Sequence, residues 1–279
     1  MRLTTAWESY AADKRLMGYS HHTLKGYKIQ TNLLAKHLGN PHIEDVTFEQ
    51  LKAYLVSQTH LKPSSLAHRV RYLKSLFHWA HDEGYLARNP ASRLREPKLG
   101  SLVPKALSEE NTELLREGCI TPFEHALIEF LYTTGCRIGE VHGLNRNAIN
   151  WETRSVIVLG KGSREREVYF TVKCGIWLKK YLKDRRDNDT ALFVTERAPR
   201  RMSISQLRHV VKRVAKRSGV EANVYPHILR HSFATHLLNN GAELADIQGY
   251  LGHTKADTTR VYAMLSSERK RERYHKFFR

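Results

Sequence analysis

The strongest constraint on the fold is a stretch near residue 100 that contains two prolines and one glycine. This stretch, REPKLGSLVPKALSEE at 95–110, lacks the apolar period of a helix and is typical of an extended linker. Apolar residues recur at helical spacing before it, whereas β-rich and helical segments both follow it. We therefore predict a helical domain at 1–96, a linker at 97–106 and a second domain at 107–279. A length of 279 residues suits two domains, since a typical domain has roughly 100–200 residues.

Two helices of the first domain are predicted from apolar spacing. The segment HTLKGYKIQTNLLAKHLG, residues 22–39, can end at Gly39 and places four apolar residues on one face: Leu24, Tyr27, Leu34 and Leu38. A second helix is expected after Pro63, with Gly84 able to close it. Its apolar stripe also has helical spacing: Leu66, Val70, Leu73, Phe77 and Ala80.

The second domain is predicted to be mainly helical with one small antiparallel sheet. RSVIVLG and EREVYFT, within 154–171, indicate a hairpin with Lys161 at or near its turn. Helix starts are indicated by Ser108 and by two possible capping boxes, Thr121 to Glu124 and Ser203 to Gln206. Further helices are expected at 172–184, 204–217, 227–239 and 243–251. The fold class is therefore mainly α, with an α+β second domain.

Positive charge is spread over both predicted domains. The chain has 46 Lys and Arg residues against 28 acidic residues, a net charge of +18. Residues 1–105 hold 16 basic and 8 acidic residues, and residues 106–279 hold 30 and 20. Two cationic domains suggest a polyanion held from more than one side, although a soluble protein of high isoelectric point has the same composition. Arg69, Arg71 and Lys74 lie beside an apolar stripe, where they either meet phosphates or form a solvated face.

Cysteine usage and hydropathy argue against two further classes of protein. The three cysteines, Cys119, Cys136 and Cys174, are odd in number and widely spaced, so neither a disulfide framework nor a zinc site is indicated. No apolar run approaches about 18 residues, and the N-terminus lacks the apolar core of a signal peptide. We expect a cytoplasmic protein that works on nucleic acid.

Four motifs carry residues suited to chemistry on a phosphodiester. They are TGCRIGEV, GKGSREREV, HILRH and LGHTKADTTRVY, and they contain six candidate catalytic residues: Arg137, Lys161, His227, Arg230, His253 and Tyr262. Arginines can hold phosphate oxygens, lysine and histidine can move protons, and tyrosine can attack phosphorus. No carboxylate cluster accompanies them, so we expect chemistry without a metal or another cofactor.

In order and spacing these motifs resemble those of the tyrosine recombinase (phage integrase) family. VPKALSEE is similar to the start of that family's catalytic domain, and the helical first 96 residues are similar to its core-site DNA-binding domain. The resemblance covers nearly the whole chain and is closest to compact members of the Xer or transposon-resolvase type. Cys136 stands where the family often has an apolar residue, and it should be tolerated as a small hydrophobe.

The resemblance implies a reaction and an assembly. Tyrosine attacks a backbone phosphate, forms a 3′-phosphotyrosyl link and releases a 5′-hydroxyl. Four protomers, either identical or of two kinds, then exchange strands between two duplexes through a four-way Holliday junction. The basic tail at 266–279 ends in Phe277 and Phe278. In the family such a C-terminal helix docks on a neighbouring protomer, although it could also fold back on its own domain.

Each candidate residue has an expected role that its chemistry supports. Tyr262 is the candidate nucleophile and would have to lose a proton, with His227 as the expected base. Arg137 and Arg230 are expected to stabilise the growing charge on the non-bridging oxygens. Lys161 is the expected acid for the departing 5′-oxygen. His253 is expected to donate a hydrogen bond to a phosphate oxygen.

Several residues keep a second interpretation. The ordinary role of Arg137 would be a surface salt bridge, and that of Lys161 would be a solvated lysine in a turn. His253 would ordinarily be a capping or core histidine. Glu140 either orients Arg137 or is a surface acid. His227 and His231 are four residues apart, but no third metal ligand is evident, so His231 and likewise His236 are expected to be structural.

Two other functions fit the same fold. A type IB topoisomerase would relax DNA with similar chemistry, and a regulator could bind DNA without cleaving it. The short two-domain plan favours recombination over relaxation, and the presence of all six residues argues against the regulator.

Overall fold

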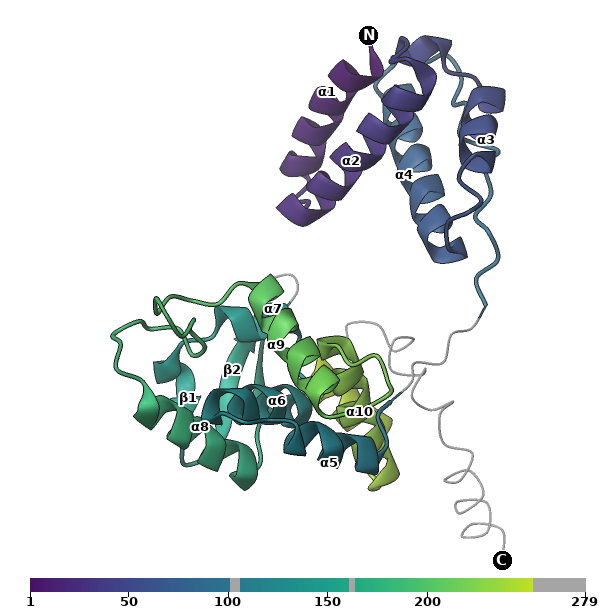
Figure 1. The fold of residues 1–279 in the computed structure, drawn as a ribbon. Helices are drawn as coiled ribbons and strands as arrows, with labels where there is room; N and C mark the ends of the chain where they lie inside the picture. Colours follow the sequence, from purple (N-terminus) through teal and green to yellow (C-terminus); the bar gives the residue numbers. More distant parts are fainter. Residues whose placement is uncertain (101–105, 161–163, 253–279) are drawn as a thin grey trace, which may run out of the picture. The chain divides into compact units, whose positions relative to one another are not determined.

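The computed structural model describes residues 1–100, 106–160 and 164–252. The chain divides into two compact units, Met1–Ser101 and Leu102–Arg279 (Figure 1). Each unit has its own hydrophobic core. The described residues are mainly helical, with a small antiparallel sheet in the second unit, so the predicted fold class is confirmed. No helix among these residues combines the length and the apolar character that a membrane crossing requires.

The first unit consists of helices around a core rich in aromatic rings. Its elements are α1 (Leu3–Leu16), α2 (His21–Leu38), the short 3-10 helix η1 (Ile43–Asp45), α3 (Phe48–Val56) and α4 (Pro63–Asp82). Tyr10 and Tyr72 are fully buried in this core. Their hydroxyls are paired, Tyr10 with Ser75 at 2.6 Å and Tyr72 with Thr31 at 2.5 Å. Pairing of these hydroxyls removes the cost of burying them.

Both helices predicted in this unit are confirmed. The side chain of Ser20 caps α2 by accepting a hydrogen bond from the backbone of Thr23, and Gly39 ends the helix with φ 76°. α4 begins at Pro63, because the first turn of a helix does not need the missing N–H. It buries most of the predicted stripe: Val70, Leu73, Phe77 and Ala80.

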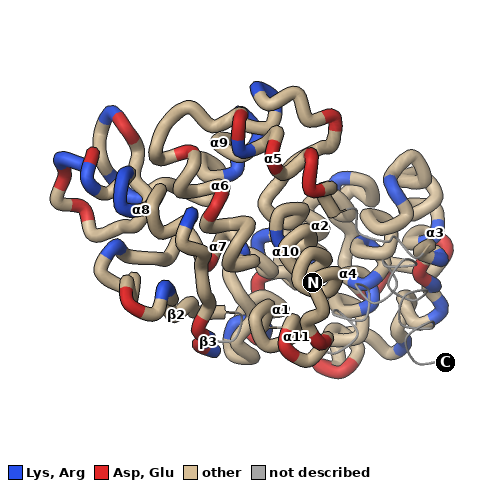
Figure 2. The backbone as a smooth tube through the Cα atoms, turned by 90° about the horizontal axis from the view of Figure 1, so that it is seen from below, with Lys and Arg blue, Asp and Glu red and all other residues tan. Residues whose placement is uncertain are grey.

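Two of the three basic residues beside this stripe have partners inside the unit. Nε of Arg71 donates to Glu96 at 2.8 Å, and Nη1 of Arg69 donates to the hydroxyl of Tyr54 at 2.6 Å. Lys74 is exposed and stays a candidate phosphate contact. Figure 2 shows Lys and Arg positions along the backbone of both units, in agreement with the spread of charge along the sequence.

In the second unit, helix α6 lies at the centre and other elements pack around it. In chain order the described elements are α5 (Glu109–Glu117), α6 (Pro122–Thr134), α7 (Ile138–Gly143), η2 (Arg146–Ala148), β1 (Ile149–Asn150), β2 (Ser155–Leu159), β3 (Glu165–Tyr169), α8 (Val172–Asp184), α9 (Ile204–Arg217), α10 (Pro226–Asn239) and α11 (Leu244–Leu251). α6 packs against α8 and α10 (Figure 1). It is buried on almost every side, as expected of a helix that lies within a core.

Two of the predicted helix starts are confirmed. The side chain of Ser108 accepts from the backbone N–H of Asn111 at the start of α5. At the start of α9, Ser203 and Gln206 form a reciprocal capping box. Each arrangement satisfies backbone donors that the first helical turn leaves without a partner.

The capping box predicted at the start of α6 is only half correct. Thr121 accepts from the backbone N–H of Glu124 at 3.2 Å. The buried carboxylate of Glu124 does not return to the backbone N–H of Thr121. It accepts from the backbone N–H of Ile120 at 3.0 Å and also binds the guanidinium groups of Arg213 and Arg217 on α9. Two charged donors and one backbone donor together stabilise this buried carboxylate.

The predicted hairpin is confirmed as β2 and β3, and the sheet has a third strand, β1, in the order β1-β2-β3. β1 is too short for its sequence to show a period. Val156 lies opposite Val168, and Val158 lies opposite Arg166. Opposite residues in an antiparallel pair share a face of the sheet. Arg166 therefore lies on the same face as the buried Val158.

Candidate nucleic-acid cleavage site

Arg137 is the N-cap of α7 and follows directly after a tight turn that ends α6. Gly135 forms this turn with φ 60°, a conformation that favours glycine. A β-carbon at Gly135 would overlap the ring of Phe233 on α10, so the turn passes close beneath that helix. Cys136 is buried in the core, as predicted, and burial raises the pKa of its thiol to about 11. The turn thus places Arg137 at the surface next to α10.

Glu140 orients Arg137 from within the protein. Its carboxylate is buried and accepts hydrogen bonds from the backbone N–H of Arg137 at 2.8 Å and from Nη1 at 2.9 Å. Burial by itself would raise the pKa of Glu140, but hydrogen bonds from Arg166 and Arg137 outweigh it and lower the pKa. Glu140 is therefore an anion at neutral pH. Of its two interpretations, the surface acid is wrong.

Arg166 stands within the GKGSREREV motif but is not among the predicted site residues, and it binds the other side of Glu140. Its Nη1 and Nη2 donate to the two carboxylate oxygens at 2.9 and 2.8 Å, and its side chain is 11% exposed. Its Nε donates to the carbonyl oxygen of Tyr250 on α11 at 2.9 Å. The alternation of side chains along β3 could have indicated that Arg166 faces the interior, because Arg166 and Val168 lie on the same face of the strand.

Arg230 lies on α10 with its guanidinium directed into the protein. The residue is 4% exposed, and it donates from Nη1 to the carbonyl of Gly135 and from Nη2 to the carbonyl of Leu251, both at 2.6 Å. These carbonyls lie at the C-terminal ends of α6 and α11, where helices leave acceptors without partners and carry partial negative charge. Arg230 is therefore anchored within the protein by two helix-end carbonyls.

His227 lies in the first turn of the same helix and is surrounded by positive charge. Partial burial lowers the pKa of its imidazole, and the charges of Arg230, Arg208 and Arg137 lower it further. The histidine is therefore neutral at pH 7 in the free protein. Arg208, on the exposed face of α9, is a second residue near the site that is not among the predicted site residues, and it lies outside the four sequence motifs. The structure brings Arg137, His227 and Arg230 together, with Arg208 nearby.

The other three predicted residues, Lys161, His253 and Tyr262, lie outside the described residues. Their described neighbours are Gly160, just before Lys161, and Gly252, just before His253. The roles of all six residues remain predictions.

Comparison with known proteins identifies the family. Residues 105–269, more than half of the chain, match the sequence model of the Phage integrase family. The chain belongs to this family. Tyrosine recombinase XerC of Oceanobacillus iheyensis is 32% identical, with 92% of this chain and 90% of XerC covered. Tyrosine recombinase XerD of Ralstonia nicotianae is 34% identical, with 91% and 87% covered. This phage integrase family member is thus an Xer-like, site-specific tyrosine recombinase that binds DNA.

Solved structures agree with the fold of this family member. A crystal structure of the XerH site-specific recombinase bound to a palindromic difH substrate, a post-cleavage complex, aligns with a TM-score of 0.77. The alignment covers 95% of this chain and 83% of XerH at 19% identity, a level that supports the fold alone.

The remaining histidines of α10 have surroundings consistent with structural roles in this recombinase. Nδ1 of His236 lies 2.7 Å from the hydroxyl of Tyr132, and Nε2 lies 3.3 Å from Glu109. Burial lowers the pKa of His231, and the positive charge of Arg230 adds to this effect. In the part of the chain that the structure describes, no three His, Cys, Asp or Glu side chains are placed to hold a metal.

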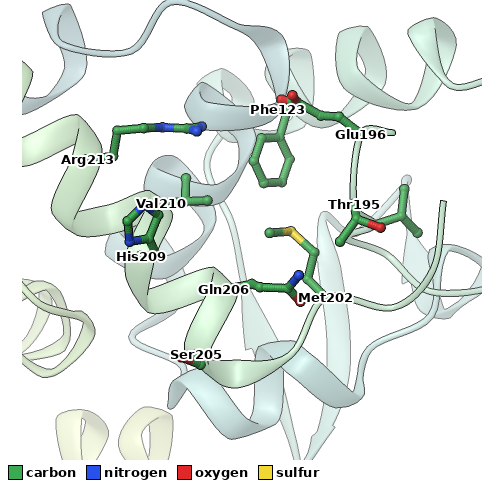
Figure 3. A pocket seen from close by; sticks show the side chains of 10 residues that line it. Phe123, Thr195, Glu196, Met202, Ser205, Gln206, His209, Val210 and Arg213 are labelled. Atoms are coloured by element: carbon green, nitrogen blue, oxygen red, sulfur yellow. The ribbon is translucent and has the colours of Figure 1, made fainter. Parts of the chain in front are cut away.

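A cavity on α9 is separate from the arginine cluster of the recombinase. Figure 3 shows its apolar side chains, Phe123, Met202 and Val210, with the polar Gln206, His209 and Arg213 around them. Its volume is about 370 Å³. Its lining contains none of the described motif residues, so it does not belong to the cleavage site.

Proposed function

We propose that this recombinase cleaves and rejoins DNA through a 3′-phosphotyrosine formed by Tyr262, and that strands are exchanged through a Holliday junction. The oxygen of Tyr262 bonds to phosphorus as the bond from phosphorus to the 5′-oxygen breaks. The proton of the tyrosine passes to His227, and Lys161 supplies a proton to the departing 5′-oxygen. A 5′-hydroxyl from another strand reverses these steps, so the bond energy is kept.

The observation that carries this proposal is the fixed pair Arg137 and Arg230. Hydrogen bonds from Arg230 to Gly135 and from Arg137 to Glu140 hold both side chains before any DNA binds. Cations held in place can stabilise the charge that grows on a pentacoordinate phosphate without first reorganising. The lowered pKa of His227 supports its role as the base, because a neutral imidazole can accept the proton.

The test is a DNA duplex nicked beside the scissile phosphate, so that the short product leaves and the covalent intermediate is trapped. We expect an adduct of protein and DNA that survives SDS in the wild type and is absent in Tyr262→Phe. A wild type that binds the site and forms no adduct would indicate the non-cleaving regulator. Relaxation of supercoiled plasmid without a specific site would favour the topoisomerase.

For the assembly, we infer four protomers on two duplexes, with residues 1–96 on the core site and the tail of each protomer on a neighbour. The spread of positive charge over both units supports a polyanion held from two sides. Removal of residues 272–279 should impair pairing of two duplexes more than binding to one site. Normal recombination by the shortened protein would contradict docking of the tail.

We infer that the chemical step uses only groups of the protein. The cations around His227 are arginines, and arginine supplies positive charge at every physiological pH. Cleavage of the nicked duplex should therefore persist in EDTA. A strict requirement for Mg²⁺ in the cleavage step itself would contradict this part of the proposal.

A further inference from the structure

Arg166 connects two segments of the second unit that are far apart in the sequence. Two of its nitrogens bind the carboxylate of Glu140 on α7, and its third binds the carbonyl of Tyr250 on α11. Arg166 itself belongs to β3, which follows Lys161 in the sequence. One side chain therefore joins α7, the hairpin and the end of α11.

Two glycines pack against this side chain, and each precedes a predicted catalytic residue. A β-carbon at Gly252 would lie 2.9 Å from Cδ of Arg166. A β-carbon at Gly160 would lie 3.4 Å from Nη1 of Arg166 and 3.7 Å from Oε1 of Glu140. The segments that lead into His253 and Lys161 therefore both run against the ion pair of Arg166 and Glu140.

We propose that Arg166 is a positioning residue for DNA cleavage. It holds Arg137 through Glu140, and it fixes the backbone at Gly160 and Gly252, the described residues directly before Lys161 and His253 in the sequence. The inference rests on the proposed function for the roles of these three residues. Arg166 itself does not touch the reacting phosphate in this proposal, because Nε, Nη1 and Nη2 each donate a hydrogen bond within the protein.

The planar geometry of a guanidinium suits this role, whereas the geometry of an ammonium group does not. Two parallel hydrogen bonds to a carboxylate together with a third to a carbonyl require the planar fork of arginine. Glu140 is buried, so it needs a cation on each side. Without Arg166 the carboxylate would rely on Arg137 alone. Arg137 would then be drawn toward Glu140 and away from the phosphate.

The first test measures single-turnover cleavage of the nicked duplex at saturating protein, together with affinity for the same site. Arg166→Gln and Arg166→Lys should bind the site within about twofold of wild type, because the positioned groups act on the chemical step. Cleavage should fall by about 10- to 100-fold, since a misplacement of roughly 1 Å can cost a factor of about 100. Arg154→Gln, which removes an exposed charge from the turn between β1 and β2, should cleave like wild type.

The second test asks whether Arg166 acts through Glu140. Glu140→Gln should slow cleavage, and the double variant with Arg166→Gln should be slowed little more than the slower single variant. Additive losses, or cleavage by Arg166→Gln at the wild-type rate, would overturn the proposal. A purely structural role predicts a lower melting temperature with an unchanged cleavage rate at temperatures where the variant is fully folded, and this result would also overturn it.

A third measurement separates this inference from the proposed function. In protein without DNA, amide hydrogen exchange within 138–143 and 244–252 should be faster in Arg166→Gln by about tenfold, and unchanged in Arg154→Gln. If wild type forms no covalent adduct, the proposed function fails and the exchange result alone decides whether Arg166 holds these segments. Unchanged exchange in Arg166→Gln would show that it does not.

Discussion

The guanidinium of Arg230 donates a hydrogen bond of 2.6 Å to the carbonyl oxygen of Gly135, across 95 positions of sequence. Gly135 stands two residues before Arg137, so the bond links the two arginines of the proposed phosphate site. The same guanidinium also holds the carbonyl of Leu251, two residues before His253. Arg230 therefore has a structural role in addition to any contact with DNA.

Replacement of Gly135 by alanine should destabilise the second unit. The backbone has φ 60° there, and the new methyl group would overlap the ring of Phe233. Overpacking of this kind costs about 1–3 kcal/mol. Gly143→Ala, at a site with no atom within 4 Å of the new carbon, should change stability by less than about 0.5 kcal/mol. Urea unfolding of both variants measures the difference, and equal stabilities would refute the close approach of the turn to α10.

Lysine substitutions should distinguish the contribution of Arg230 to stability from that of Arg137. Arg230→Lys leaves at least one of two buried helix-end carbonyls without its donor, so it should cost about 1.5–3 kcal/mol of unfolding free energy. Arg137→Lys should cost less stability, because its side chain is partly exposed. Both should slow single-turnover cleavage by about 100- to 1000-fold. Chemical unfolding and the nicked-duplex assay report these effects, and an Arg230→Lys protein as stable as wild type would contradict the anchoring role.

The pKa of His227 predicts the pH dependence of the free protein. Because the folded pKa lies below the unfolded value of about 6.5, the unfolded chain binds the proton first as pH falls. Stability should therefore be lost between about pH 6.5 and the lowered folded pKa, and it should not change above this window on account of His227. NMR titration of the imidazole, assigned with His227→Gln, gives the pKa directly. A value above 6.5 without DNA would contradict the cluster of arginines around it.

Arg208→Gln should change both the histidine and the DNA affinity. Loss of a nearby positive charge should raise the pKa of His227. If Arg208 meets a phosphate, the slope of log K against log salt should become shallower by about 1. Lys212→Gln, one helical turn further along the exposed face of α9, removes the same charge as a control. An unchanged imidazole titration in Arg208→Gln would place Arg208 outside the site.

Local features of the fold could be predicted where short-range physics decides them. The end of α2 at Gly39, the start of α9 at Ser203 and the hairpin of β2 and β3 depend on residues close in sequence. The capping box at Thr121 forms only in part, because the carboxylate of Glu124 binds the backbone N–H of Ile120 and the guanidinium groups of Arg213 and Arg217, which lie about 90 positions away. A motif confined to one helical turn does not show that side chains from another helix will bind the same carboxylate.

For the site, the sequence alone determined which residue types are present, their order, and hence the resemblance to tyrosine recombinases. The placement of Arg137 and Arg230 beside His227 is a property of the tertiary structure. So are the burial of Glu140 between two arginines and the reach of Arg166 to α11. The reason is physical: these side chains and helix-end carbonyls become partners only when packing of the helices and the sheet removes them from water, and many of these partners lie tens of residues apart.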